Sequence, residues 1–364
     1  MGERTLTIRL LAGLTVVVLL AGCASGATSM PSSTPAATAA TVTPSAAAAV
    51  PSASASPASM APAPSATPVP ILATAVLPSP TPVRVTHVPF TPSVPCSAPI
   101  PVMCRLQLTI YAPTSGGQWP LVVFVSGASG TEKYDPTLTP EEQKATNEWP
   151  EFGKPLAGQG AVVMVAWYRE QMSEGGGYPV TLMDIACAIG VARNIGATYG
   201  ADPARVTLVG HSYGGWPAAV VALTPTPFIP PTGSCDPTSG SLRPDAFVGM
   251  DGLYIEVQNH AAYPIQLLTP TVYADETSRA AALAAEDPYA LAKKYPAGPG
   301  STTIRLLYGA LDQTADLAWS QSLDAALAAA GYGSTLRLVP GADHMGVLTA
   351  PETIAAILAL AKGK

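Results

Sequence analysis

The stretch Val206-Thr-Leu-Val-Gly-His-Ser-Tyr-Gly-Gly215 decides the fold of this 364-residue chain. Val206–Val209 predicts a short buried strand, and the residues after the stretch predict a helix. Between the two lies the pattern Gly-x-Ser-x-Gly, formed by Gly210, Ser212 and Gly214. In so tight a turn a Cβ atom at either glycine would clash with neighbouring backbone. We therefore expect Ser212 to be held in a strained conformation, with its hydroxyl exposed above the sheet edge as a nucleophile.

Strands and helices alternate on both sides of this turn. Apolar runs predict strands, and apolar residues at helical spacing predict helices. The strands are expected at 106–111, 121–125, 161–167, 206–209, 246–250, 304–308 and 335–339, and the helices at 182–199, 316–330 and 352–361. Such alternation predicts an α/β fold with a mostly parallel central sheet and helices on both faces.

Residues from about 105 to 364 resemble the α/β-hydrolase fold, in particular its acetyl-esterase, carboxylesterase and feruloyl-esterase-like branch. The resemblance is carried by Leu106–Pro113, Asp202–Gly215, Leu306–Asp312 and Pro340–His344. It implies a serine hydrolase that works through an acyl-enzyme and a Ser-His-Asp triad, without a cofactor. It also implies the chain order serine, acid, histidine.

His344 is the histidine that fits this order, because it follows the last predicted strand. The other histidines are His87 before the first strand, His211 inside the turn and His260 in an irregular segment. We expect the His211 side chain to point away from the nucleophile. A carboxylate must hold the imidazole in one tautomer. Asp312 follows the strand 304–308 and is the expected acid, whereas Asp251, at the end of the preceding strand, is the competitor.

The oxyanion hole needs backbone N–H donors aimed at the tetrahedral oxygen. The resemblance places one donor at Tyr213 and the other at Ala128, in the loop that follows the strand 121–125. Many relatives have His-Gly-Gly in this loop, and this chain has Ser126-Gly127-Ala128 instead. The departure weakens assignment to the His-Gly-Gly esterases more than it weakens the case for catalysis.

The N-terminus has the pattern of an export signal: a basic start, the apolar run 10–20 and small residues before Cys23. Leu20-Ala-Gly-Cys23 resembles the bacterial lipoprotein box, which implies cleavage after residue 22 and lipid on Cys23. An ordinary signal peptide with a chance cysteine is the alternative. Residues 23–84 are rich in Ala, Ser, Thr and Pro and predict a disordered linker. Residues 85–364 then form the catalytic domain.

With Cys23 set aside for lipid, four cysteines remain, and export favours disulfides among them. We expect Cys96–Cys104, which closes a short loop, and Cys187–Cys235, because this fold places the helices before and after the nucleophile strand side by side. Free buried thiols are the alternative. No cysteine or histidine spacing suggests a metal site. The net charge of −6, without a basic run, argues against a nucleic-acid partner.

The sequence therefore predicts a lipid-anchored serine hydrolase, exported to the cell envelope and acting on a small or polymer-linked carboxylic ester. A serine peptidase or an acyltransferase would use the same chemistry. A catalytically silent surface lipoprotein, which binds a ligand through the same fold, is the alternative from another class.

Overall fold

The computed structural model describes residues 68–92, 94–95, 103–127, 149–169, 178–235, 240–254, 276–333 and 336–363. All of them belong to one folded unit, Ser65–Lys364. Its centre is an eight-stranded sheet with the order β1-β4-β6-β5-β7-β8-β9-β10. β4 runs antiparallel to its neighbours β1 and β6, and all other neighbouring strands in this sheet are parallel. The predicted α/β fold with a mostly parallel sheet is confirmed.

The predicted strands and helices are found close to their expected positions. In the large sheet the strands are β1 (Val83–Pro89), β4 (Gln107–Pro113), β5 (Trp119–Val125), β6 (Val162–Ala166), β7 (Ala201–His211), β8 (Ala246–Met250), β9 (Thr303–Gly309) and β10 (Leu336–Val339), and a separate pair is formed by β2 (Val94–Pro95) and β3 (Met103–Cys104). The α-helices are α2 (Pro150–Gly158), α3 (Val180–Ile195), α4 (Gly215–Leu223), α5 (Glu276–Ala285), α6 (Pro288–Lys294), α7 (Leu317–Ala329) and α8 (Pro351–Ala361).

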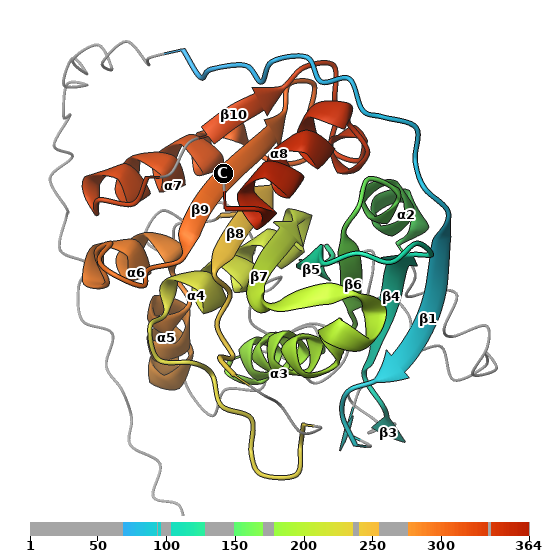
Figure 1. The fold of residues 1–364 in the computed structure, drawn as a ribbon. Helices are drawn as coiled ribbons and strands as arrows, with labels where there is room; N and C mark the ends of the chain where they lie inside the picture. The colour runs from blue at the N-terminus through green and yellow to red at the C-terminus, as the bar shows by residue number, and fades with distance from the viewer. Residues whose placement is uncertain are drawn as a thin grey trace, which may run out of the picture. The chain divides into compact units, whose positions relative to one another are not determined.

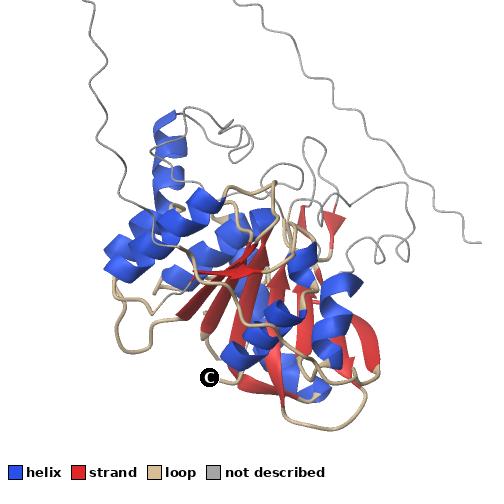
Figure 2. Ribbon diagram, turned by 90° about the horizontal axis from the view of Figure 1, so that it is seen from above, coloured by secondary structure: helices blue, strands red, loops and turns tan. Residues whose placement is uncertain are grey.

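Helices cover both faces of the sheet (Figures 1 and 2). On one face, α2 and α8 bury a cluster that includes Phe152 and Ile357 against Phe124 and Val163 of the strands. On the other, residues of α3, α4, α6 and α7 join the larger core cluster. The central strands β5, β6 and β8 are apolar nearly throughout because a sheet covered on both faces has no solvated side.

Helix α3 and the turn after it, Val180–Tyr199, are long and apolar enough to cross a membrane by length and composition alone. However, 72% of the most apolar window of this segment is buried inside the domain. Within the described residues, this is the only helix that meets those criteria, and its burial is that of a core helix.

The boundary predicted at residue 84 is wrong, because the preceding residues already belong to the folded unit. Residues 68–82, drawn in blue in Figure 1, run from β10 past α8 and α2 to β1. Leu72 N–H donates to Leu338 of β10, and Leu338 N–H donates to Pro70. Further on, Ala75 N–H donates to Glu352, and Thr81 N–H donates to the Gly158 carbonyl. We call residues 68–82 the strap. It was missed because backbone hydrogen bonds hold it, and apolar periodicity does not reveal these.

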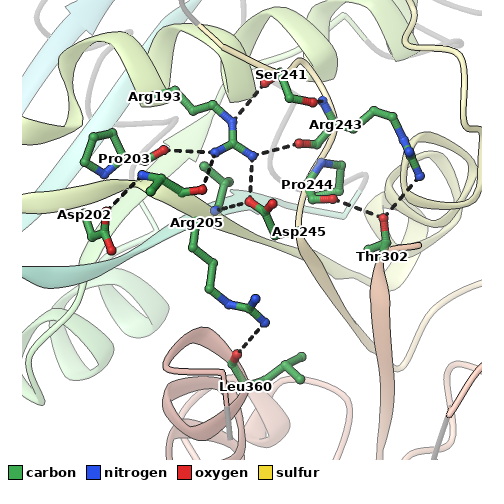
Figure 3. A network of polar contacts seen from close by, with 12 residues as sticks. Arg193, Asp202, Pro203, Arg205, Ser241, Arg243, Pro244, Asp245, Thr302 and Leu360 are labelled. Atoms are coloured by element: carbon green, nitrogen blue, oxygen red, sulfur yellow. Dashed lines mark hydrogen bonds and ion pairs between the residues drawn. The ribbon is translucent and has the colours of Figure 1, made fainter. Parts of the chain in front are cut away.

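A buried arginine joins the strand ends opposite the predicted nucleophile (Figure 3). The Arg193 guanidinium of α3 donates to the carbonyls of Pro203, Ala204, Ser241 and Arg243 and to the carboxylate of Asp245. Asp245 also accepts the Val206 N–H. The network joins the N-terminal part of β7 to the residues just before β8. It therefore helps to set the register of these two strands, whose carboxyl ends lead to Ser212 and Asp251.

One of the expected disulfides is present, between Cys187 of α3 and Cys235 in the loop after α4, with 6.0 Å between the Cα atoms. This confirms the predicted Cys187–Cys235 pair, and contacts between α3 and α4 show that the two helices lie side by side. The partner expected for Cys104 is Cys96, which lies outside the described residues, as does Cys23. Those two predictions stay untested.

Candidate active site

Ser212 lies at the sharp turn between β7 and α4. Its φ of 54° is one of two positive φ values among the described non-glycine residues. A Cβ on Gly210 would lie 2.7 Å from the Gly214 carbonyl, and a Cβ on Gly214 would lie closer still to the Ser126 carbonyl. Only glycine fits either position, so the clash predicted from the pattern is a property of the fold. The turn holds Ser212 in its left-handed conformation by surrounding it with backbone.

Three predicted residues from separate segments meet at this turn. Ser212 Oγ lies 2.9 Å from His344 Nε2, and His344 Nδ1 lies 2.8 Å from Asp312 Oδ2. The Asp312 side chain has no exposed surface, and that of His344 is 15% exposed. Since Nδ1 must carry a proton to donate to the carboxylate, Nε2 is left as an acceptor for the serine proton. The arrangement can activate a serine hydroxyl as a nucleophile.

The loop after β9 fixes the second oxygen of Asp312. Thr314 N–H donates to Oδ1 at 2.6 Å, and Ala315 N–H donates to it at 3.3 Å. Asp312 N–H itself donates to the Gly309 carbonyl, which closes the turn. The two oxygens of this carboxylate therefore have separate tasks: one faces the backbone and the other faces the imidazole.

The loop after β5 lies directly against the serine. A Cβ on Gly127 would come within 2.7 Å of Ser212 Cβ and 3.2 Å of Ser212 Oγ. Tyr168 fixes this loop by donating its hydroxyl proton to the Ser126 carbonyl at 2.7 Å, in a buried position. Tyr213, expected to donate its N–H to an oxyanion, follows Ser212 in the turn. Ala128, expected to supply the second N–H, lies outside the described residues.

Two further buried polar side chains, His211 and Asp251, lie beside the imidazole of His344. Sequence patterns did not reveal this placement. His211 was expected to point away from the nucleophile; its ring centre lies 4.8 Å from that of His344, and its Nε2 donates to the His344 carbonyl at 2.8 Å. Burial, and then the neighbouring His344, lower the pKa of His211 to about 4. The ring is therefore neutral at pH 7, and it holds the backbone of the loop that carries His344.

Asp251, the competitor for the acid, is fully buried at the end of β8 and has a φ of 44°. Its Oδ1 accepts the Gly309 N–H at 2.7 Å. Burial, supported by the neighbouring carboxyls of Asp312 and Asp343, raises the pKa of Asp251 to about 8, although the Gly309 N–H opposes the shift. The structure thus places Asp312, and not Asp251, in contact with His344.

Among the described residues, one cluster has the residue types of a metal site: His211, Asp251 and His344, whose ligand atoms lie within 4.8 Å of one another. Both ring nitrogens of His344 are already engaged, by Ser212 and Asp312. His211 uses Nε2 for the His344 carbonyl. The donor set is therefore arranged for proton transfer and does not fit a metal ion.

The sequence matches the model of the alpha/beta hydrolase family over residues 122–357. No curated protein matches it. Among solved structures, a carbohydrate esterase from gut microbiota is similar with a TM-score of 0.54 and 18% identity, over 76% of this chain and 95% of that one. Apo esterase 2 of Thermogutta terrifontis is similar with a TM-score of 0.51 and 21% identity, over 71% and 88%. At these identities the likeness shows the fold alone.

Proposed function

Since the chain belongs to the alpha/beta hydrolase family, we propose that it is a serine hydrolase that cleaves carboxylic esters through Ser212, His344 and Asp312. The observation that carries the proposal is the continuous hydrogen-bonded path from Ser212 Oγ through both nitrogens of His344 to Asp312 Oδ2. A serine with an adjacent base that is itself oriented by a carboxylate is the geometry of nucleophilic acyl transfer.

In the proposed reaction Ser212 Oγ attacks the ester carbonyl while His344 Nε2 takes the hydroxyl proton. The carbonyl oxygen becomes an oxyanion, which we assign to the N–H groups of Tyr213 and Ala128. The N-terminus of α4 directly after the turn adds a favourable partial charge. Collapse of the intermediate breaks the bond to the alcohol, which leaves with the proton from His344. Water, activated by the same imidazole, then releases the acid and restores Ser212.

The experiment combines covalent labelling with turnover. A fluorophosphonate probe should label the wild-type protein and leave Ser212→Ala unlabelled. p-Nitrophenyl esters of increasing acyl length, acetylated sugars, feruloyl esters and peptide amides should be compared under one set of conditions. Cleavage of esters with little cleavage of amides supports the proposal. Preferred cleavage of amides would indicate a peptidase, and transfer to an added alcohol would indicate an acyltransferase. Absence of both labelling and turnover would favour a silent binding protein.

We also propose that the protein is exported and anchored in the cell envelope by lipid on Cys23. The signal pattern of residues 1–22 and the lipoprotein box support this. Attached acyl chains contribute about 0.8 kcal/mol of membrane affinity per buried CH₂, so more than one chain gives a stable anchor. Mass spectrometry of the membrane fraction should find the mature N-terminus at a lipid-modified Cys23. Cys23→Ser should remove the lipid, and an unmodified N-terminus elsewhere would overturn the proposal.

A further inference from the structure

The loops after β8 and β9 are joined at Asp251. Asp251 N–H donates to the Leu307 carbonyl of β9, and its Oδ1 accepts the N–H of Gly309, from which the Asp312 loop departs. Two residues further on, Leu253 N–H donates to the Ser212 carbonyl. The short segment 251–253 therefore holds both the turn of the nucleophile and the base of the loop that carries the acid.

The second oxygen of Asp251 has surroundings that do not suit an anion. Oδ2 is buried and has no hydrogen-bond partner. The Asp251 carboxyl interacts with the carboxyl of Asp312. His211 lies within 4.8 Å, and its unpartnered Nδ1 is an acceptor, because Nε2 carries the proton donated to the His344 carbonyl. An ionised Asp251 carboxyl would thus have two acceptors close to it, whereas a protonated one has acceptors to which its O–H can donate.

We propose that Asp251 is a positioning residue of the active site, held as the neutral carboxylic acid: its Oδ1 anchors the acid loop through Gly309, and its Oδ2–H donates toward the carboxylate of Asp312. This rests on the proposed function for the role of Asp312. When two carboxyls interact directly, ionising both is costly, so one of them keeps its proton. Asp251 is the one that keeps it, because Asp312 Oδ1 already accepts N–H groups.

The charge state of Asp251 is testable without turnover. The raised pKa of Asp251, about 8 against an ordinary value of about 4 in the unfolded chain, means that the folded protein binds the extra proton. The contribution of this bound proton to the stability of the fold is complete below pH ~4 and is lost as the pH rises toward ~8. The titratable groups facing Asp251 are Asp312, Asp343, His211, His344, Tyr254 and Tyr308.

The first experiment compares wild type with Asp251→Asn by infrared difference spectroscopy and by Tm against pH. We expect a protonated-carboxyl C=O band at pH 7 in the wild type that is absent from Asp251→Asn. We also expect the Tm of Asp251→Asn, measured relative to that of the wild type, to increase as the pH rises from 5 to 8. Asp202→Asn, a control in the network of Figure 3 whose amide oxygen can still accept the Ala204 N–H, should change neither result. A wild type without the acid band would overturn the proposal, whether or not the protein hydrolyses esters.

The second experiment tests positioning through kcat. Asp251→Leu leaves the buried Gly309 N–H without an acceptor, so kcat should fall by roughly tenfold or more with KM little changed. Asp251→Asn keeps the carbonyl oxygen for Gly309 and an N–H in place of the O–H, so it should recover most of that loss. Equal losses in both variants would show that an ionised Asp251 is required and would refute the neutral acid.

Discussion

Replacing Asp312 with asparagine should disable His344 because the surrounding backbone decides which way the amide turns. Oδ1 of Asp312 accepts N–H groups from Thr314 and Ala315. In the Asp312→Asn variant the amide oxygen should stay there, which places the NH₂ group against His344 Nδ1. Nδ1 must then accept, so the imidazole proton moves to Nε2 and points at Ser212 Oγ. In that tautomer His344 cannot take the serine proton.

The size of the effect follows from the cost of turning the amide over. Turning the amide over breaks the hydrogen bonds from both backbone N–H groups and places an NH₂ group against them. The total cost is roughly 2–4 kcal/mol. At about 1.4 kcal/mol per factor of ten, the productive orientation is then held by about one molecule in 30 to 1000. Even that fraction lacks the negative charge that stabilises the imidazolium. We therefore expect kcat/KM to fall by about 10³- to 10⁴-fold, as for the same substitution in serine proteases.

The assay is hydrolysis of p-nitrophenyl acetate, with the rate of fluorophosphonate labelling as a second measure. Asp343→Asn is the matched control, since Asp343 neighbours His344 in sequence, is exposed, and uses its carboxylate to accept the Gly346 N–H; it should stay within a few-fold of wild type. An Asp312→Asn rate within tenfold of wild type, in a protein with unchanged circular dichroism, would refute the assignment of the acid.

Three further outcomes are expected. Ser212→Ala should keep the wild-type Tm within a few degrees and lower kcat by several orders of magnitude; turnover within tenfold would exclude it as nucleophile. Replacing both Cys187 and Cys235 with serine opens a link across 48 residues, so chain entropy predicts a loss of about 4 kcal/mol; an unchanged urea midpoint would contradict this. A chain that begins at residue 68 should match the Tm of the longer protein, whereas one that begins at 83 lacks the strap and should lose roughly 2–4 kcal/mol; equal Tm values for the two would show that the strap adds nothing.

Local patterns were enough to predict most of the sheet and the residues that meet at Ser212. The strand 246–250 was predicted to the residue because it is buried on both faces and reads as one apolar run. Ser212 and His344 followed from a turn motif and from chain order. Asp312 required a choice between strand ends that the resemblance favoured, and the hydrogen bond to His344 supports that choice.

The features that were missed depend on contacts between distant segments. Helix α2 contains Pro155, which normally argues against a helix interior, and the burial of Phe152 and Leu156 outweighs it. The proton on Asp251 depends on burial and on the approach of Asp312, neither of which has a sequence signature. The same holds for His211, whose place beside the ring of His344 follows from the turn of the backbone at Ser212.

The strap also affects how the molecule avoids self-association. An edge strand exposes unpaired N–H and C=O groups, which can recruit the edge of another molecule and begin aggregation. The edge strand β1 carries Arg84 and ends at Pro89, two residue types that discourage such pairing. At the opposite edge, the strap pairs with Leu338 of β10 through a parallel bridge from Ile71. The strap thus covers a sheet edge that would otherwise be open to pairing with neighbouring copies of the chain.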